Sequence, residues 1–501
     1  MSDSPTSEPE SNFVCDCKSE VISHPMIIQE MLSACAGQPF YGEHDGRRYC
    51  VLHYPSMEKK EDFDRVVQQK LDVADFNFAG VWFPDAPFES LIFDADVNFS
   101  SAHFDAKAYA FFAGARFNGN ANFGRAQFKG SVYFGEAQFS ADAYFDFAHF
   151  SEEATFFCAE FNGNAYFYCA EFNGNAIFDN AKFSADAHFS HAQFREGAGF
   201  YSVVFNTTAL FYGTRFIDDN SHGNSAIINN NVSGTDDALE AKVKTNSVCF
   251  DGANFNDGVI FKGTEFADQV FLSFSGAIFE KPERVIFHTA PLRPHWFINV
   301  DPREFTFIDV RWRFLNNQDA IREEIEALRR SKKEKLSRLL ELTFRHLAVN
   351  AEENNRYDEA SRFRYLAMDA RRLESWRGFA PWKLSWWYWL TSGYGERVLQ
   401  AFLVLLGIWF VAGLLYTRAG FARWEPKLAS ESDVIGAKRD DVGAPLKFSR
   451  ALTYSVGVMT LQKPEPRPAT TAAQTVVLLE TILGPVQAAL LALAIRRKFM
   501  R

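Results

Sequence analysis

Two long apolar stretches near the C-terminal end dominate the hydrophobic pattern of the chain. The first, 398–416, contains no charged residue, and the second, 473–495, contains one, Glu480. An α-helix needs about 20 apolar residues to cross a bilayer. The pattern therefore predicts two transmembrane helices, the second followed by a basic tail that ends at residue 501.

A shorter, half-apolar segment at 448–468 lies within the connector 417–472 between these two stretches. It is too short and too polar to span a bilayer, but it is long enough to enter and leave from one side. We therefore expect a re-entrant segment here. Two spans around such a segment predict a small membrane module joined to a large soluble body.

Phenylalanine follows a regular period in the first half of the chain. From Phe112 to Phe216 its positions alternate between steps of five and six, which gives the eleven-residue repeat A-x-F-x-x-x-A-x-F-x-x. Such steps do not keep to one face of an α-helix, whereas residues two apart on an extended segment share a face. Alanine and phenylalanine should face inward in stacked coils, so the pattern predicts a parallel β-helix over 81–290.

The adjacent repeats AEFNGNAYFYC and AEFNGNAIFDN, which begin at Ala159 and Ala170, resemble those of the pentapeptide-repeat family. The resemblance covers about 83–280 and implies a right-handed, four-sided β-helix. Two eleven-residue repeats would close each coil, so we expect about 22 residues per coil. The resemblance says little about function, because one fold serves many functions.

A polar segment at 217–247 interrupts the repeats, which resume at Phe250. Its composition predicts a loop that leaves the β-helix. Two interpretations stay open. The segment is either a tolerated insertion or a loop that binds a partner, since long loops are often functional.

The segment before the repeats, 1–80, concentrates cysteine and histidine. Cys17, Cys35, Cys50 and His53 supply three thiolates and one imidazole, a donor set that suits tetrahedral zinc. Their spacing matches no standard zinc finger, so both a structural zinc site and unligated intracellular cysteines stay open. A small segment with little apolar content needs a staple to fold, which favours the metal.

Residues 291–375 are predicted to form a helical connector that resembles a single tetratricopeptide-like helix pair, broken at Asn354 and Asn355. It serves either as a plain connector or as an element that couples the β-helix to the membrane module. The next segment, 376–397, is rich in tryptophan and tyrosine, which predicts an interfacial helix. Its Gly-Tyr-Gly sequence precedes the first span, where no filter can lie, and predicts a turn.

The membrane module resembles the two-span ion-channel family, in which a pore helix and a filter loop lie between the spans. The resemblance places a pore helix at about 449–459 and pore or filter positions at Ser455, Thr460, Leu461 and Gln462. The glycine-bearing strand of a potassium filter is missing after Thr460, so potassium selectivity does not carry over. Two spans cannot enclose a pore, and the resemblance implies an assembly of four copies.

The second span carries polar residues on one helical face, Glu480, Gly484 and Gln487, with Pro485 beside the glycine. An intramembrane carboxylate is costly and faces water or a bonding partner. Two roles stay open. The residues either line a cation path, with Gly484 and Pro485 as a flexible point, or Glu480 is an anchor buried behind the re-entrant segment and bonded to its backbone.

Charge and motifs exclude several classes of protein. The net charge of −11 argues against a nucleic-acid binder, and we find no common catalytic motif, so we expect no enzyme. The N-terminus shows no secretory pattern and the seven cysteines form no disulfide framework, which predicts a reducing compartment. Basic residues before the first span and after the second predict cytoplasmic termini in an inner or plasma membrane.

Two functions of different classes fit these features. The first, which we favour, is an oligomeric channel-like protein for an inorganic cation, whose cytoplasmic β-helix senses a signal or docks an unidentified protein. The second is a membrane-anchored scaffold that does not conduct. The re-entrant segment and the polar face of the second span favour the channel, and the missing filter strand favours the scaffold.

Overall fold

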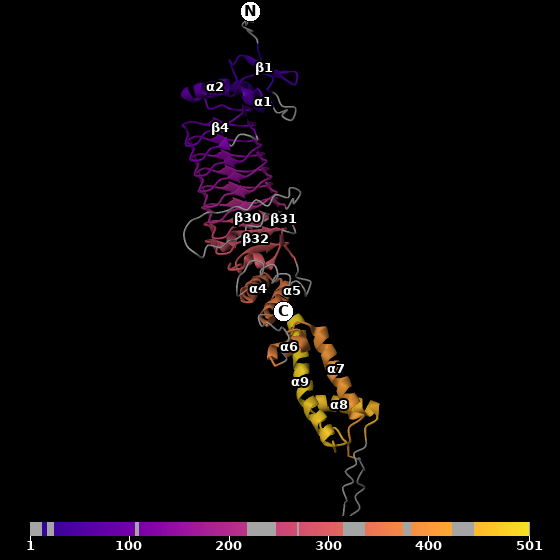
Figure 1. The fold of residues 1–501 in the computed structure, drawn as a ribbon. Coiled ribbons are helices and arrows are strands. Elements are labelled where there is room, and N and C mark those ends of the chain that lie inside the picture. Colours follow the sequence, from indigo (N-terminus) through magenta and orange to yellow (C-terminus); the bar gives the residue numbers. More distant parts are fainter. Residues whose placement is uncertain are drawn as a thin grey trace, which may run out of the picture. The chain divides into compact units, whose positions relative to one another are not determined.

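A computed structural model describes residues 13–17, 25–105, 110–217, 247–267, 270–313, 336–373, 382–422 and 445–499. The chain divides into two compact units, Met1–Asn350 and Ala351–Arg501 (Figure 1). Residues 218–246 of the predicted loop, residues 314–335 of the predicted helical connector and residues 423–444 between the two predicted spans lie outside the described residues.

The first unit begins with a small mixed segment that precedes the β-helix. It contains α1 (Pro25–Ala34), the antiparallel strands β1 (Phe40–His44) and β2 (Arg47–Cys50), the 3₁₀ turn η1 (Met57–Lys59) and α2 (Lys60–Asp72). Phe63 on α2 is buried, and its ring centroid lies 5.4 Å from that of Phe83 in the first coil. The segment therefore packs on the N-terminal end of the β-helix (Figure 1).

A right-handed parallel β-helix follows, as the repeats predict. Ala143 pairs with Ala121 on one side and with Ala165 on the other, so each coil takes 22 residues. Each regular coil gives one short strand to each of four parallel sheets. The predicted coil of two eleven-residue repeats is confirmed.

In the first sheet most strands begin at an alanine of the repeat, and in the second sheet each strand ends at a phenylalanine. The first sheet consists of β6 (Val97–Asn98), β10 (Ala121–Asn122), β14 (Ala143–Tyr144), β18 (Ala165–Tyr166), β22 (Ala187–His188), β26 (Ala209–Leu210), β30 (Val259–Lys262), β34 (Val285–His288) and β36 (Thr306–Ile308). The second consists of β3 (Trp82–Phe83), β7 (His103–Phe104), β11 (Gln127–Phe128), β15 (His149–Phe150), β19 (Glu171–Phe172), β23 (Gln193–Phe194), β27 (Arg215–Phe216) and β31 (Glu265–Phe266).

The other two sheets complete the four sides. The third consists of β4 (Ala86–Pro87), β8 (Ala110–Phe111), β12 (Val132–Tyr133), β16 (Ala154–Thr155), β20 (Ala176–Ile177), β24 (Ala198–Gly199), β28 (Ser247–Cys249) and β32 (Phe271–Ser273). The fourth consists of β5 (Ile92–Phe93), β9 (Arg116–Phe117), β13 (Gln138–Phe139), β17 (Glu160–Phe161), β21 (Lys182–Phe183), β25 (Val204–Phe205), β29 (Asn254–Phe255) and β33 (Ile278–Phe279). β26 pairs directly with β30, so the interruption in the sequence leaves the ladder continuous.

Phenylalanine and alanine fill the interior of the β-helix, as their period predicts. Phe128 stacks on Phe150 of the next coil with centroids 5.0 Å apart and parallel planes. Within a coil, rings from neighbouring sides meet edge to face, as Phe145 and Phe156 do at 5.5 Å. Such aromatic pairs add about 0.5–1.5 kcal/mol each to the stabilisation from burial.

One corner position in each repeat adopts a left-handed backbone. The φ angle is +55° at Cys158 and Cys169 and +59° at Asn180 and His191, and these positions recur every eleven residues. A residue with a Cβ atom rarely occupies this region. Regular stacking therefore holds each corner in a conformation that the side chain alone would not choose.

The β-helix extends beyond residue 290, into the segment that we expected to be a helical connector. Strand β36 continues the first sheet, and β35 (Pro291–Leu292) pairs with β37 (Arg311–Trp312). The turn η2 (Pro282–Arg284) lies between β33 and β34, the turn η3 (Pro294–Phe297) lies between β35 and β36, and α4 (Leu336–Glu353) follows the last strand. Asn350 on α4 donates hydrogen bonds to the carbonyl groups of residues 302, 303 and 305, which fixes the helix to the last coil.

The second unit is helical. It contains α5 (Tyr357–Leu373), α6 (Leu384–Ser392), α7 (Val398–Tyr416), α8 (Phe448–Met459) and α9 (Thr471–Phe499). Helix α7 and residues 471–497 of α9 are long and apolar enough to cross a membrane. The short helix α8 packs against both of them, toward the ends far from α6 (Figure 1). It occupies the segment where we expected a pore helix.

Candidate functional site

The first candidate site lies where α8 meets the two long helices, and small residues let the three helices approach closely. A Cβ atom on Gly413 of α7 would lie 2.6 Å from Leu452 Cδ2 of α8. A Cβ atom on Gly484 of α9 would lie 2.9 Å from Met459 Cγ. Packing through small residues is typical of helices within membranes. Gly484 thus serves helix packing, and α9 continues as a helix through Pro485.

Glu480 of α9 joins all three helices. Its side chain is 3 % exposed, and its two carboxylate oxygens accept hydrogen bonds from Tyr416 Oη of α7 and Ser455 Oγ of α8. A second link between α7 and α8 runs from Trp409 Nε1 to the carbonyl oxygen of Leu452, at 3.1 Å. The contact of Glu480 with α8 is to a side-chain hydroxyl, not to the backbone that the anchor interpretation expected.

Gln487 is bonded within the second unit as well. It is 2 % exposed, and its Nε2 donates to the carbonyl oxygens of Thr391 and Ala401, each at 2.8 Å. These acceptors lie in α6 and α7. The two polar side chains that we placed on one face of the second predicted span are therefore both bonded within a single chain, which favours the anchoring role over a role in lining a path.

Of the predicted pore or filter positions, Ser455 lies inside α8, whereas Thr460, Leu461 and Gln462 form a turn at the end of that helix. Thr460 Oγ1 donates to the carbonyl oxygen of Val456 at 2.9 Å, and the backbone N–H of Gln462 donates to that of Gly457 at 2.9 Å. Leu461 has a φ angle of +60° and is 64 % exposed. The chain therefore folds back on the helix here, instead of presenting the extended row of carbonyl groups that a potassium filter requires.

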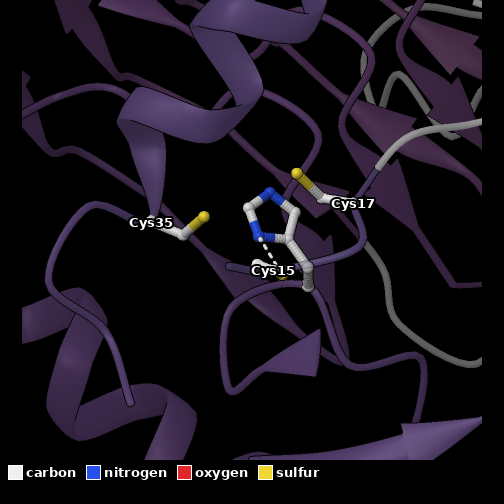
Figure 2. A group of neighbouring side chains, drawn as sticks. Cys15, Cys17 and Cys35 are labelled. Atoms are coloured by element: carbon white, nitrogen blue, oxygen red, sulfur yellow. Dashed lines mark hydrogen bonds between the residues drawn. The ribbon is translucent and has the colours of Figure 1, made fainter. Parts of the chain in front are cut away.

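The second candidate site is a cluster of buried thiols in the N-terminal segment. The ligand atoms of Cys15, Cys17, Cys35 and His53 all lie within 4.8 Å of one another, and all four residues are buried. Figure 2 shows the three cysteine side chains gathered around one imidazole ring. This arrangement could hold a metal ion. The predicted set contained Cys50, and the structure groups Cys15 with the other three instead.

Cys50 lies beside this group without completing it. Its Sγ is 3.3 Å from His53 Nδ1, and its backbone N–H donates to Cys15 Sγ at 3.3 Å. A signal for Cys15 was present in its position two residues before Cys17. Spacing alone did not distinguish Cys15 from Cys50: both thiols lie close to His53 Nδ1, Cys15 Sγ at 3.7 Å and Cys50 Sγ at 3.3 Å, and Cys15 is the one whose sulfur lies within 4.8 Å of the other three ligand atoms.

The thiols of the cluster influence one another strongly. Hydrogen bonds from Cys17, Cys35 and Cys50 lower the pKa of Cys15, so the cluster stabilises a thiolate there. The same interactions raise the pKa of Cys35 above its usual range and that of Cys17 to about 12. A buried thiolate among protonated thiols is a ready starting point for metal binding, because the metal displaces the remaining protons.

Lys59 is a buried cation next to this cluster. It is 1 % exposed, its Nζ donates to the carbonyl oxygens of Val51 and Leu52 at 2.8 Å, and it lies over the rings of Phe63 and Trp82. Burial lowers the pKa of Lys59 well below its usual value, while charge on Cys50 and Cys15 opposes that shift. Negative charge in the cluster therefore favours the ammonium form.

Comparison with known proteins identifies the repeats. Residues 112–157 and 159–204 match the family model for pentapeptide repeats, with 9 copies. These two stretches of the β-helix thus consist of pentapeptide repeats. Two solved structures of trypsin-treated variants of QnrB1, a plasmid-mediated fluoroquinolone resistance protein, are similar to this chain at 13 % and 15 % identity. They cover 49 % and 47 % of this chain and 93 % of their own, with TM-scores of 0.18 and 0.16. A search of curated proteins returned no match.

Proposed function

We propose that this protein is an oligomeric, channel-like membrane protein whose pentapeptide-repeat β-helix is a sensor or docking domain. The observation that carries the proposal is the hydrogen bonding of Glu480 to α7 and α8. A plain anchor needs only apolar helices, whereas a carboxylate in the middle of a membrane costs about 2.5–3.5 kcal/mol. The task that justifies this cost is to hold α8 in position between the two spans.

The subunits would assemble around a common axis. Helices α7 and α9 leave large apolar side chains exposed, as contact with lipid or with a neighbouring subunit requires; these include Leu399, Leu403, Ile482, Leu483 and Val486. One subunit with two spans and α8 cannot enclose a pore. Four copies is the number that the resemblance to two-span channels implies, and the turn 460–462 would then face the axis.

The orientation and the ion follow from the sequence. Arg397 and the basic tail around Arg497 flank the two spans on the side that carries both termini, which favours cytoplasmic termini in an inner or plasma membrane. An inorganic cation is the substrate that the resemblance implies. Potassium selectivity requires an extended strand whose backbone carbonyl groups form rings around the ion. The turn at Leu461 and the neighbouring Lys463 stand where that strand would lie, so they oppose potassium selectivity.

The β-helix offers a surface for a partner protein. Tyr144 stacks on Tyr166 at 5.0 Å, and Tyr166 stacks on His188 at 4.9 Å, along the outer face of the first sheet. Phe147 and Tyr168 at the adjoining corner are 44 % and 42 % exposed. Aromatic side chains are enriched in protein interfaces, so a docked protein is the partner that this face favours. The same face supports the second candidate function, an anchored scaffold that does not conduct.

The cofactor that we propose for the N-terminal cluster is zinc, in a structural role. Three thiolates and one imidazole form the closed tetrahedral shell that structural zinc prefers. Burial of all four side chains leaves no open position for a substrate.

Ion flux through the full-length protein in liposomes tests the channel directly. We expect cation flux above that of protein-free liposomes, a loss of at least about tenfold for Glu480→Leu, and flux within about threefold of the wild type for Glu480→Gln, which keeps one acceptor oxygen and offers an amide N–H donor to the other hydroxyl group. Ile482→Val, an exposed position on the same helix, is the matched control.

Absence of flux in the wild type across voltage, tension and pH would contradict the channel and favour the scaffold. Flux that survives Glu480→Leu unchanged would leave the channel standing but would contradict the positioning role of Glu480.

A further inference from the structure

The N-terminal cluster does more than stabilise its own segment. This inference rests on the proposal that the cluster binds zinc. We infer that the zinc ion fastens the N-terminal segment as a cap over the first coil of the β-helix. Cys15, Cys17, Cys35 and His53 are the ligands, and Cys50 is a neighbour that does not bind the metal.

The four ligands come from separate pieces of the chain. Cys15 and Cys17 lie on the extended segment 13–17, Cys35 directly follows α1, and His53 lies in the turn after β2. A small segment of this kind has little apolar interior of its own. Backbone hydrogen bonding already joins segment 13–17 to β2, where Asp16 N–H donates to the carbonyl oxygen of Arg48 at 2.8 Å. One ion bound by all four residues would add a link from these two pieces to the end of α1.

His53 connects the cluster to the first coil. Its Nε2 lies 3.1 Å from the carbonyl oxygen of Ala79, which is fully buried. A bond of this kind places the proton on Nε2 and leaves the Nδ1 lone pair for the metal. Histidine ligands of metals commonly donate their second N–H to a backbone carbonyl group, and this bond fixes the orientation of the ring.

The cap also contacts the coil directly. The backbone N–H of Trp82 donates to the carbonyl oxygen of Leu52 at 3.0 Å. Met31 of α1 packs on Gly80, where a Cβ atom would lie 2.3 Å from Met31 Cε. The metal therefore holds pieces that themselves cover the end of the β-helix.

Charge around the cluster is balanced when zinc is bound. A zinc ion with three thiolates and a neutral imidazole has a net charge of about −1. Lys59 supplies one positive charge in the same buried region. Without the metal, fewer thiolates form and the ammonium group loses part of its compensation.

The cap protects the edge of the β-helix. Strands β3, β4, β5 and β6 each stand at the end of a sheet. Asn77 bridges the outer side of β6 at Asn98, whereas β3, β4 and β5 have a strand neighbour on one side only within their sheets. Unpaired strand edges promote association with other chains, and repeat proteins need capped ends to stay soluble. Loss of zinc would uncover these edges.

The test compares Cys35→Ser, which removes a ligand, with Cys50→Ser as a matched control from the same cluster. For the full-length protein in detergent, zinc content is measured by mass spectrometry and local opening by hydrogen exchange at 76–83. We expect one zinc per wild-type chain, zinc retained in Cys50→Ser and lost in Cys35→Ser. In Cys35→Ser, exchange at 76–83 should rise at least about tenfold, with no change at 154–161 in a central coil. Chelation of the folded wild type should give the same pattern, and it replaces Cys35→Ser if that variant does not fold.

Each alternative result has a distinct meaning. A wild type without zinc would overturn the zinc proposal itself. Zinc loss without a change at 76–83 would leave the zinc site intact and overturn its role in fastening the cap. Loss of zinc in Cys50→Ser would overturn the ligand set.

Discussion

The β-helix and the helical module formed by α6–α9 build their interiors in different ways. In the β-helix one contact recurs from coil to coil, so that Phe128 stacks on Phe150 at 5.0 Å and Phe150 stacks on Phe172 at 4.6 Å. In the helical module the decisive contacts occur once, at Glu480 and at Gln487. In the β-helix many equivalent positions contribute to stability. In the helical module the position of α8 depends on the hydrogen bonds of one residue, Glu480.

This difference has an energetic consequence. The stability of a repeat domain is close to a sum of terms for neighbouring coils, so a change in one coil acts mainly on that coil and its neighbours. Among its described residues, the module has no second copy of the Glu480 contact that would compensate for its loss. A substitution in the β-helix should therefore mainly lower stability. A substitution of similar size in the module should mainly alter assembly and function.

The largest expected effect belongs to the interior of the β-helix. Phe145→Ala removes a fully buried ring that is stacked on both neighbouring coils, and it should cost about 3–5 kcal/mol. Phe147→Ala, two residues away and 44 % exposed, should cost less than about 1 kcal/mol. Urea unfolding of the full-length protein, monitored by hydrogen exchange in the central coils, measures the loss of unfolding free energy in both variants. Equal losses would contradict the inward and outward assignment of these positions.

A smaller effect on stability is expected at Glu480. Glu480→Leu leaves the hydroxyl group of Tyr416 without its acceptor, whereas Ser455 Oγ keeps the carbonyl oxygen of Trp409 at 3.3 Å, so the expected cost is about 1–3 kcal/mol. Glu480→Gln keeps an acceptor oxygen and should cost about 1 kcal/mol. Thermal unfolding of the two variants in detergent separates them. If leucine is tolerated as well as glutamine, the hydrogen bonds of Glu480 do not hold α8.

The sequence predicted the β-helix well because its rule is local. An alanine two residues before a phenylalanine shares its face on an extended segment, so this spacing alone predicts that both side chains point inward. The period also repeats often enough to exclude an α-helix. The left-handed corners escaped notice, because residues such as Cys158 and His191 do not favour that conformation by themselves. The final strands at 306–308 and 311–312 were also missed, because the regular eleven-residue period has ended there.

The candidate sites were harder to predict because their residues meet only after folding. Glu480 is 64 residues from Tyr416 and 25 from Ser455, so no local spacing reveals the partners of its carboxylate. The polar face of the second span was recognised, but periodicity cannot say whether a face meets water or another helix. Cys15 and Cys50 likewise looked alike as donors, and only the fold selects between them.

Cross-linking between subunits tests the central claim most directly. The sequence has no cysteine after Cys249, so Gln462→Cys would place a single thiol at the turn that follows α8. If α8 and this turn face a common axis, mild oxidation of the full-length protein in its membrane should give disulfide-linked dimers. Leu399→Cys, on the exposed face of α7, is the comparison for random contact. Linkage at 462 well above that at 399 is the predicted result, and equal or absent linkage at 462 would contradict a channel-like assembly.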